Sequence, residues 1–414
     1  MLFGDPLLRD RVFVCVLLSN VCERFAASAM AVLLGFQVFE VTRNPLDLGW
    51  LGLIEAVPGI GLVLYGGHVA DRHRRRTILL ITSAGLVVLA LAAAMASRFA
   101  PGAVWPLFGI GFLLGIVRAF EDPAAAGLEA QVVPMAALVR GTALLTTTAR
   151  LAAVMGPVLG GFAYGWAGPA WTYAVIALLF GGALVALLPI PNPPPVGERD
   201  EQGAVVRIVE GVRFVLHDQL LLGSMLLDLF AVFFGGAAAL LPAIATEILH
   251  VGPTGFGVLR SAMAAGALVA ALFAARMLPE RRAGRALLWV IGGFGLAIVV
   301  FGVSRVLWLS VLALFLAGMC DGMSVVIRRA ILRIASPEGM RGRIAAVKSV
   351  FVGSSNELGA FESGVAASLM GVSAAVWSGG LVTLAIVGAT AVLFPKLRRL
   401  DLREMAQAGA GGLR

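Results

Sequence analysis

The chain has 414 residues, of which 59% are hydrophobic, and it carries a formal net charge of +8 at pH 7. Soluble globular domains contain about 45–50% apolar residues, so this composition excludes an ordinary soluble fold. The basic residues are dispersed over many short segments, which argues against a nucleic-acid partner and indicates membrane topology and attraction to anionic lipid.

Twelve segments are apolar and long enough to cross a bilayer, which takes about 20 residues in a helix. The third, sixth, ninth and twelfth contain no Asp, Glu, Lys or Arg, and they lie at about 77–97, 169–190, 286–304 and 374–394. Most of the others carry a charge near mid-membrane depth. Since a lipid-facing charge costs at least about 2.5–3.5 kcal/mol, charged helices should surround water or one another. The pattern predicts an all-α polytopic membrane protein with twelve transmembrane helices and the polar interior of a solute transporter.

Three acidic residues within the spans have no basic partner on their own helical turn: Glu23 in the first span, Asp228 in the seventh and Glu357 in the eleventh. Arg24 adjoins Glu23 in sequence, but its side chain is expected to point elsewhere. Carboxyl groups held away from water take up protons readily, so these three are predicted to couple transport to protons. Two further carboxyl groups within spans are candidates for the same role, Asp321 and Glu362.

The loop after the second span reads GGHVADRHRRR from Gly66 to Arg76. A glycine permits close helix approach, and an aspartate at a helix end can pair with arginines or cap a neighbouring helix. Such a cluster can latch the two halves of the protein together on the cytoplasmic side, and breaking it would favour the opposite opening. A plain basic anchor would explain the arginines, but not the glycine and the aspartate at this spacing.

Charges in the fourth and fifth spans are candidates for a central cavity. Arg118, Glu121 and Asp122 occupy positions i, i+3 and i+4, so they share one helix face. They either neutralise one another or form a site for a proton or a substrate. Arg150 in the fifth span and Asn20 in the first are further candidates to line the cavity.

The fifth span contains a run of small residues around one proline, Gly156-Pro157 followed by Gly160-Gly161. Small residues let helices pack closely, and a proline bends a helix and frees a main-chain carbonyl group. The run is therefore predicted to be a close helix contact. Ordinary packing of small residues would produce the same pattern.

Residues 191–218 are predicted to link two six-helix halves, 1–190 and 219–397, with a cytoplasmic tail at 398–414. Prolines from Pro191 onward end the sixth span. Residues 203–217 alternate apolar and charged side chains, as in an amphipathic helix on the inner membrane surface. The halves share a proline six residues before an arginine: Pro134 with Arg140, and Pro337 with Arg343, 203 positions later. Parallel six-span repeats are a known plan of transporters.

The arginines predict the orientation in the membrane. If the N-terminus is cytoplasmic, the outside loops hold only Arg43, Arg98 and Arg305, which fits the rule that positive residues stay inside. Both termini are then expected on the cytoplasmic side of the inner membrane of a bacterium. No cleaved signal peptide is expected, because the first span is long and lacks a cleavage site.

These motifs resemble those of the major facilitator superfamily. Its signature between the second and third helices, Gly-x-Leu-Ala-Asp-Arg-x-Gly-Arg-Arg, is matched by Gly67, Ala70, Asp71, Arg72, Arg75 and Arg76. Arg74 stands where the family has a glycine in a tight turn. The resemblance implies that Asp71 pairs with charges of this loop and near the end of helix four, where Glu129 is a candidate.

The run in the fifth span resembles the antiporter motif of that superfamily, Gly-x-x-x-Gly-Pro-x-x-Gly-Gly, with Ala152 in place of the first glycine. The motif implies an exporter that exchanges its substrate for protons. The wider pattern, which includes the stretches 121–124, 140–144 and 355–364, resembles the drug and siderophore exporter branch that contains enterobactin exporters.

No P-loop, metal-ligand cluster or catalytic set of residues is evident, so no cofactor and no enzymatic activity are expected. The sequence therefore predicts a monomeric secondary transporter with a small-molecule substrate, protons and membrane lipid as its partners. Three alternatives remain open. One is a lipid or lysolipid transporter with little dependence on a proton gradient, another is a proton-coupled uptake symporter, and the third is a sensor that binds a ligand without transport.

Overall fold

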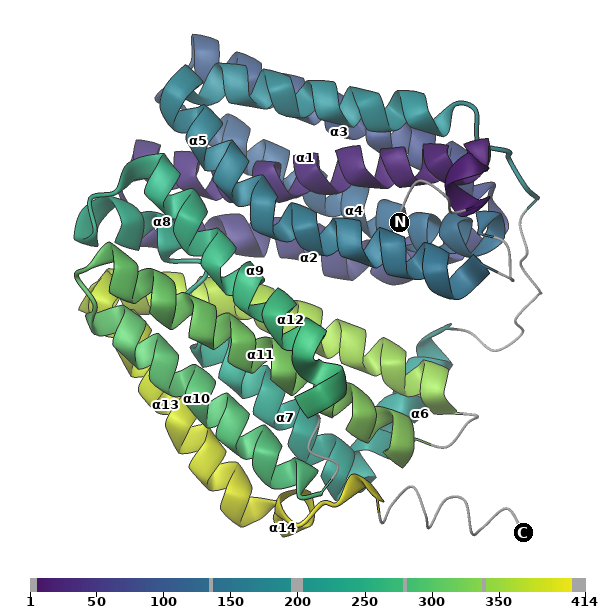
Figure 1. Ribbon diagram of the computed structural model, residues 1–414. Helices are drawn as coiled ribbons and strands as arrows, with labels where there is room; N and C mark the ends of the chain where they lie inside the picture. The colour runs from purple at the N-terminus through teal and green to yellow at the C-terminus, as the bar shows by residue number, and fades with distance from the viewer. Residues whose placement is uncertain (1–5, 134–136, 195–203, 278–280, 337–339, 404–414) are drawn as a thin grey trace. The chain divides into compact units, whose positions relative to one another are not determined.

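A computed structural model describes residues 6–133, 137–194, 204–277, 281–336 and 340–403. Within these ranges the chain forms helices joined by turns, and no β-strand is present (Figure 1). The chain divides into two compact units. Unit 1 comprises Met1–Asp200 with Val251–Ser261, and unit 2 comprises Glu201–His250 with Ala262–Arg414.

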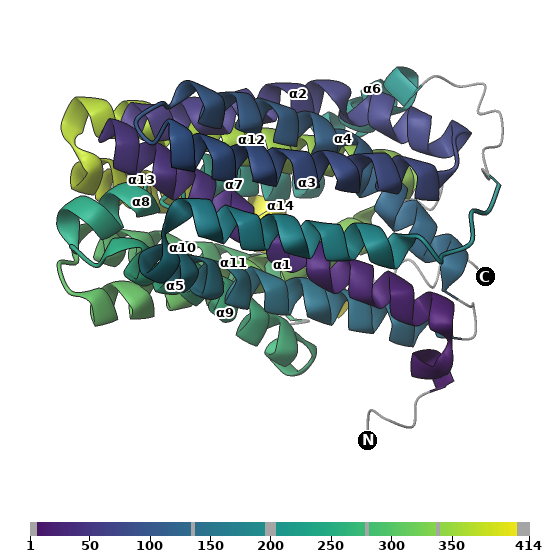
Figure 2. The ribbon, with the colours of Figure 1, turned by 90° about the horizontal axis from the view of Figure 1, so that it is seen from above.

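Unit 1 is a bundle in which long helices lie side by side (Figures 1 and 2). Helix α1 packs against α5, α2 packs against α4, and α3 packs against both α4 and α5. The helices are α1 (Arg11–Thr42), α2 (Pro45–Arg72), α3 (Arg75–Phe99), α4 (Trp105–Val132) and α5 (Leu138–Leu187). The segment Val251–Ser261, which contains the beginning of α9 (Gly252–Met277), also belongs to this unit.

Helix α5 contains 50 residues, which is far more than one membrane crossing needs, and it is broken at Gly168. The backbone of Gly168 has φ 79° and ψ 172°, a conformation that is essentially restricted to glycine. Pro169 follows, and its fixed φ suits the first position of a new helix. The chain reverses direction at this point (Figure 1). Two predicted spans, the fifth and the sixth, therefore lie within α5.

Unit 2 is also a helical bundle. Helix α10 packs against α11 and α13, and α7 packs against α12 and α13. The helices are α6 (Ala204–His217), α7 (Gln219–Phe234), α8 (Leu241–Ala243), the remainder of α9, α10 (Ala283–Val303), α11 (Leu307–Ala335), α12 (Arg341–Met370), α13 (Val372–Leu393) and α14 (Pro395–Arg398). A π-helical turn, Ile244–Ile248, directly follows α8.

Helix α6 corresponds to the predicted amphipathic segment, and it contacts other helices of unit 2. Val215 packs in a buried apolar cluster with Leu221 of α7 and with Ile344 and Val347 of α12. On its polar side, Glu210 forms an ion pair with Arg343 of α12. The apolar face thus covers protein, at least in part. A position of α6 on the membrane surface stays a prediction.

Eight helices of the described residues are long and apolar enough to cross a membrane, or nine if the sharply bent pair of α6 and α7 counts as one span. The all-α polytopic membrane class is therefore confirmed. The count of twelve stays a prediction, for two physical reasons. Helix α5 is one 50-residue element although it bends at Gly168, and α4 and α12 carry several charged side chains that lower their apolar character.

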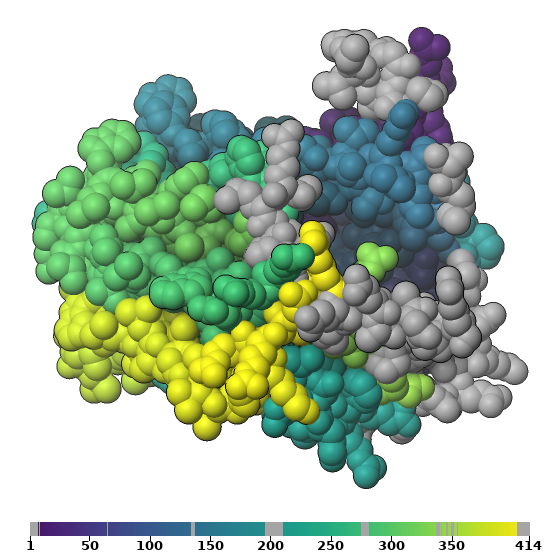
Figure 3. Space-filling model, turned by 60° about the horizontal axis from the view of Figure 1, so that its bottom comes forward, coloured from purple at the N-terminus to yellow at the C-terminus, as the bar shows by residue number. Residues whose placement is uncertain are grey.

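The four segments without internal charges expose large apolar side chains. Such exposure is expected of surfaces that face lipid, and it would be costly over so large an area in water. In Figure 3, α13 and α14 lie at the surface and are coloured yellow. The exposed side chains include Ile81 and Val88 of α3, Trp171 and Leu178 of α5, Trp289 and Leu296 of α10, and Val392 and Leu393 of α13.

Candidate transport sites

A cluster of charged side chains lies between α1, α2 and α4 of unit 1, where Glu121 is buried, Glu23, Arg24, Glu55 and Arg118 are half-buried, and Asp122 is exposed. Glu23 lies near the guanidinium groups of Arg24 and Arg118 and near the carboxyl group of Asp122. The expectation that Arg24 points away from Glu23 is wrong, because its Nε lies 3.4 Å from Glu23 Oε2. Both side chains are long enough to fold back toward each other although the two residues are adjacent on the helix.

Helix α4 contributes the other charges of this cluster. Arg118 forms an ion pair with Glu55 of α2, so at least one of its partners comes from a neighbouring helix rather than from its own face. Glu121 is buried, with 7% of its surface exposed, and the carboxyl groups of Glu23 and Asp122 are its neighbours. The structure thus brings together the predicted charges of the first and fourth spans, and it adds Glu55.

A hydrogen-bond network that includes the carboxyl group of Glu129 connects this region to α5. Asn20 Nδ2 donates to Glu129 Oε1 at 3.2 Å, and Thr148 Oγ1 donates to Asn20 Oδ1 at 2.9 Å. Glu129 also lies near Arg24. Glu129 was expected to join the charges of the loop after α2, but the hydrogen-bond partner that the structure gives it is Asn20 of α1. Glu129 lies near the end of α4, and its side chain points toward α1 in the bundle.

The loop between α2 and α3 is held by Arg75. Its Nη2 lies 3.6 Å from Asp71 Oδ1, and its Nη1 donates to the carbonyl oxygen of Gly127 at 2.9 Å. We call this set of contacts, Asp71, Arg75 and the Gly127 carbonyl, the loop latch. Helix four therefore contributes a main-chain carbonyl group to the latch, rather than the predicted side chain of Glu129.

Arg76 makes a second connection at the same end of unit 1. Its Nε donates to the carbonyl oxygen of Leu187 at 3.1 Å, and its Nη2 donates to that of Leu188. Carbonyl groups at the end of a helix lack partners within the helix, so a guanidinium group there is stabilising. Arg72 is exposed. Arg74 has φ −65° and ψ 112°, so this turn does not need the glycine that the family has there.

The glycine that permits the close approach of α2 and α4 is Gly66, whereas the sequence motif points to Gly67. A Cβ atom at Gly66 would lie 2.0 Å from the carbonyl oxygen of Ala119 on α4. A Cβ atom at Gly67 would have no neighbour within 4 Å. The sequence predicted that a glycine of this loop permits close helix approach, and the structure gives this role to Gly66. The two glycines differ only in the direction that each faces on α2, and the motif does not encode that direction.

The antiporter-like run of α5 lies in a close contact, and its residues are buried. Gly156 and Gly160 face α1, and a Cβ atom at Gly161 would lie 2.4 Å from the carbonyl oxygen of Pro253. Ser261 donates to the carbonyl oxygen of Val154, within one turn of Pro157. A helical proline disturbs the hydrogen bonds of the preceding turn, so this hydroxyl group satisfies a carbonyl near the break.

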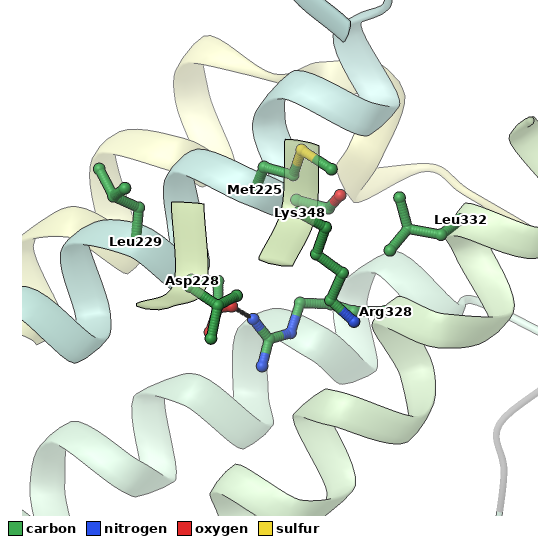
Figure 4. Close-up of a pocket in the computed structure, with 8 residues that line it drawn as sticks. Met225, Asp228, Leu229, Arg328, Leu332 and Lys348 are labelled. Atoms are coloured by element: carbon green, nitrogen blue, oxygen red, sulfur yellow. Dashed lines mark ion pairs between the residues drawn. The ribbon is translucent and has the colours of Figure 1, made fainter. Parts of the chain in front are cut away.

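In unit 2, Asp228 of α7 forms a buried ion pair with Arg328 of α11 (Figure 4). Arg328 also donates from Nε to the carbonyl oxygen of Ser324 at 3.2 Å and from Nη2 to Ser324 Oγ at 3.1 Å. Lys348 of α12 lines the same pocket. Asp228 was singled out because its own turn holds no basic residue. Its partner is 100 positions away in sequence, and sequence spacing gives no sign of the pair.

The other candidates are more dispersed. Asp321 lies on α11 and is partly buried, and Glu362 is half-buried on α12 beside Ser363. Glu357, also on α12, is half-buried, and Arg150 is half-buried on α5. The prolines of the internal repeat, Pro134 and Pro337, lie outside the described residues.

Sequence reasoning gave no role to two residues of these clusters, Glu55 and Arg328. A usable signal was available, because both are charges within an apolar span, and the same signal had singled out Arg118. Thr148 and Ser324 carried no signal, since single hydroxyl groups are common in helices.

Comparison with known proteins gives the family. A model of the transmembrane secretion effector family matches residues 5–409, nearly the whole chain. The chain belongs to this family of the major facilitator superfamily. The predicted resemblance to that superfamily is thereby confirmed.

Two curated relatives of this family member cover nearly its full length. It is 26% identical over 394 residues to the enterobactin exporter EntS of Citrobacter koseri, which covers 94% of this chain and 92% of that protein. It is 24% identical over 380 residues to EntS of Salmonella choleraesuis, covering 91% of each. These relatives are exporters, so the transporter class predicted from the sequence is supported.

Solved structures share the fold of this family member at low sequence identity. A POT family transporter in complex with 5-aminolevulinic acid superposes with a TM-score of 0.75 at 14% identity, covering 96% of this chain and 98% of that one. A bacterial homologue of the human lysosomal transporter Spinster, inward-facing and unoccupied, gives 0.71 at 14% identity, with coverage of 97% and 99%. These structures show that the chain has the same fold. Together with the family match and the exporter relatives, the fold identifies the chain as a secondary transporter.

Proposed function

We propose that this secondary transporter exports small amphipathic compounds, with siderophores among its substrates, in exchange for protons. The observation that carries the proposal is the acid-rich cluster of unit 1, in which carboxyl groups outnumber guanidinium groups. Its carboxyl groups are those of Glu23, Glu55, Glu121, Asp122 and Glu129, and its guanidinium groups are those of Arg24 and Arg118.

Such an imbalance has a simple chemical consequence. A carboxylate held away from water needs a nearby positive charge. Where there are fewer positive charges than carboxylates, a carboxylate can become neutral by taking up a proton instead. Glu121 fits this role, because it is buried and its neighbours include two other carboxyl groups. Protons entering and leaving this cluster would change the charge of the bundle interior, which is a means of coupling proton flow to alternating access.

Two further features support export. Two relatives that cover more than nine tenths of the chain are named as enterobactin exporters, and α5 carries the close-packed run that resembles the antiporter motif. We place the protein in the bacterial inner membrane with both termini cytoplasmic, from the distribution of arginines. In that orientation the loop latch lies on the cytoplasmic side, where its rupture would accompany opening toward the cytoplasm.

The test is transport by the purified protein in liposomes with an imposed pH gradient. Enterobactin and a panel of cationic drugs serve as substrates, and wild type is compared with Glu23→Gln, Glu121→Gln, Asp228→Asn and Glu357→Gln. Lys396→Gln is the control, since Lys396 is exposed on α14 and belongs to neither cluster.

Gradient-driven export that Glu121→Gln abolishes and Lys396→Gln preserves is the expected result. Flux that is equal with and without the gradient would refute proton coupling and favour the lipid transporter instead. Gradient-driven flux that survives all four substitutions would remove these carboxyl groups from the mechanism. Accumulation in the direction of proton flow would indicate a symporter.

A further inference from the structure

The tryptophans of this chain gather at one end of the membrane-crossing helices. In the orientation given above, this end faces the outer side. Of the seven tryptophans, Trp289, near the beginning of α10, lies elsewhere. The others lie close to the turns that join α1 to α2, α3 to α4, α10 to α11 and α12 to α13, or beside the bend of α5 at Gly168: Trp50, Trp105, Trp166, Trp171, Trp308 and Trp377.

Two of these tryptophans occupy equivalent positions of the internal repeat. Trp105 is the first residue of α4, and Trp308 is the second residue of α11. They are 203 positions apart, which is also the spacing between Pro134 and Pro337. Trp105 is 79% exposed and Trp308 is 74% exposed, so neither ring fills the interior of its bundle. Packing within the protein therefore does not explain why both halves carry a tryptophan here.

An arginine precedes each of these two tryptophans in its turn. Arg98 and Arg305 are both exposed, and the segments 98–105 and 305–308 contain no acidic residue. No carboxylate of the same turn competes for either guanidinium group. A guanidinium group matches the geometry of a phosphate group, and an indole ring favours the level of the lipid headgroups. Each turn thus offers two groups that suit a phospholipid.

The spacing along the helices also fits a bilayer. On α11, Trp308 and the exposed Arg329 are 21 positions apart, and on α2, Trp50 and the exposed Arg72 are 22 positions apart. At about 1.5 Å per residue these spacings correspond to roughly 32–33 Å. The hydrocarbon core of a bilayer is about 30 Å thick. The tryptophans at one end and the arginines at the other therefore lie where the two headgroup layers would be.

We propose that the turns at 98–105 and 305–308 bind phospholipids of the outer leaflet. Arg98 and Arg305 contact the phosphate groups, and Trp105 and Trp308 lie at the level of the glycerol and ester carbonyl groups. There the indole N–H group finds an acceptor, which hydrocarbon does not offer. The inference goes beyond the proposed function, because it concerns the lipid around the transporter and not the substrate.

The depth of the tryptophans is tested by fluorescence quenching of the full-length protein in phosphatidylcholine liposomes. The lipid carries bromine either near the carbonyl end or near the methyl end of its acyl chains. Subtracting the signals of Trp105→Phe, Trp308→Phe and Trp289→Phe from wild type isolates each ring. Trp289 is the control, since it is 77% exposed and lies six positions inside α10, at a depth of about 9 Å.

Bromine near the carbonyl end should quench Trp105 and Trp308 at least about twofold more than bromine near the methyl end. The preference of Trp289 should be weaker or reversed. Equal preferences of all three rings would overturn the proposal. So would an absence of quenching at Trp105 and Trp308, because a second copy of the protein would then cover them.

The arginines are tested by titrating the protein in dodecyl maltoside, a detergent without phosphate, with brominated phosphatidylcholine. The readout is again the quenching of Trp105 and Trp308. The double variant Arg98→Gln/Arg305→Gln should need about two- to fivefold more lipid for half-saturation. Arg74→Gln, exposed at the opposite end of unit 1, should need the same amount as wild type.

Brominated diacylglycerol, which has the same chains and no phosphate, is the matched probe. Its half-saturation should be equal in wild type and in the double variant. A double variant that takes up phosphatidylcholine like wild type would overturn the role of the arginines, as would an equal loss for both lipids. None of these measurements uses a pH gradient, so their outcome is independent of the test of proton-driven export.

Discussion

Two neighbouring glycines on α2 provide a sharp test of the helix packing in unit 1. Gly66→Ala and Gly67→Ala change the same residue type, in the same helix, by the same single methyl group. Alanine stabilises a helix by roughly 1 kcal/mol relative to glycine, and this contribution is common to both variants. Any difference between them therefore reports what surrounds each Cβ atom.

The structure predicts a large difference. The Cβ atom of Gly66→Ala would lie 2.0 Å from the carbonyl oxygen of Ala119 and 2.8 Å from its carbonyl carbon. Non-bonded contacts need about 3.5 Å, so α2 and α4 would have to separate by more than about 1 Å. Overpacking of this kind costs about 1–3 kcal/mol. The Cβ atom of Gly67→Ala meets nothing within 4 Å, so only the helix contribution remains.

The assay is unfolding of each variant by SDS in mixed micelles, followed by circular dichroism, together with transport in liposomes. Gly67→Ala should match or exceed wild type in free energy of unfolding, and Gly66→Ala should fall about 1–3 kcal/mol below Gly67→Ala, because the helix contribution is the same in both variants and cancels in the comparison. Equal stability of the two variants would refute the assigned contact of α2 with α4. So would the reverse order.

Three further predictions concern single interactions, each measured by the same unfolding assay. Arg75→Gln loses the charged hydrogen bond of the loop latch and should lower the free energy of unfolding by about 1–3 kcal/mol. Arg74→Gln, at an exposed position, should lower it by less than about 0.5 kcal/mol. Equal costs of the two substitutions would contradict the latch. Arg328→Gln leaves Asp228 buried without this partner and should lower the free energy of unfolding by about 3–5 kcal/mol. Adding Asp228→Asn should recover part of that loss. If the effects of the two substitutions simply add in the double variant, the ion pair is contradicted. Ser261→Ala should cost about 1 kcal/mol through the hydrogen bond to α5, and an unchanged stability would show that this bond contributes nothing.

The polar network of α1 and α4 shows how far sequence reasoning reaches. A charge within an apolar span is visible in the sequence, and its cost in lipid requires that it face the bundle interior. Glu23, Arg118 and Glu121 were found in this way, and the structure places them close together. Their partners were not found, because a partner such as Glu55 is chosen by which helices lie side by side.

The loop after α2 shows the same limit at finer scale. Its motif identified Asp71 and Arg75, and these two residues do pair. The motif did not reveal that Arg75 also binds the main chain at Gly127, since a carbonyl group carries no residue signature. Gly66 and Gly67 are identical in the sequence, and only their orientation on α2 tells which of them faces α4.

The sequence by itself determined the all-α membrane class, because the cost of charge and of unpaired main-chain groups in lipid acts on each segment separately, and its motifs indicated the family. The count of twelve spans and the choice of the segments that face lipid stay predictions. The tertiary structure alone decided the pairs: Asp228 with Arg328, Glu55 with Arg118, and Asn20 with Glu129. Each pair joins residues at least 63 positions apart in sequence, on different helices. Which side chains meet depends on the rotation and crossing of whole helices, and these are set by the packing of the entire bundle rather than by any local pattern.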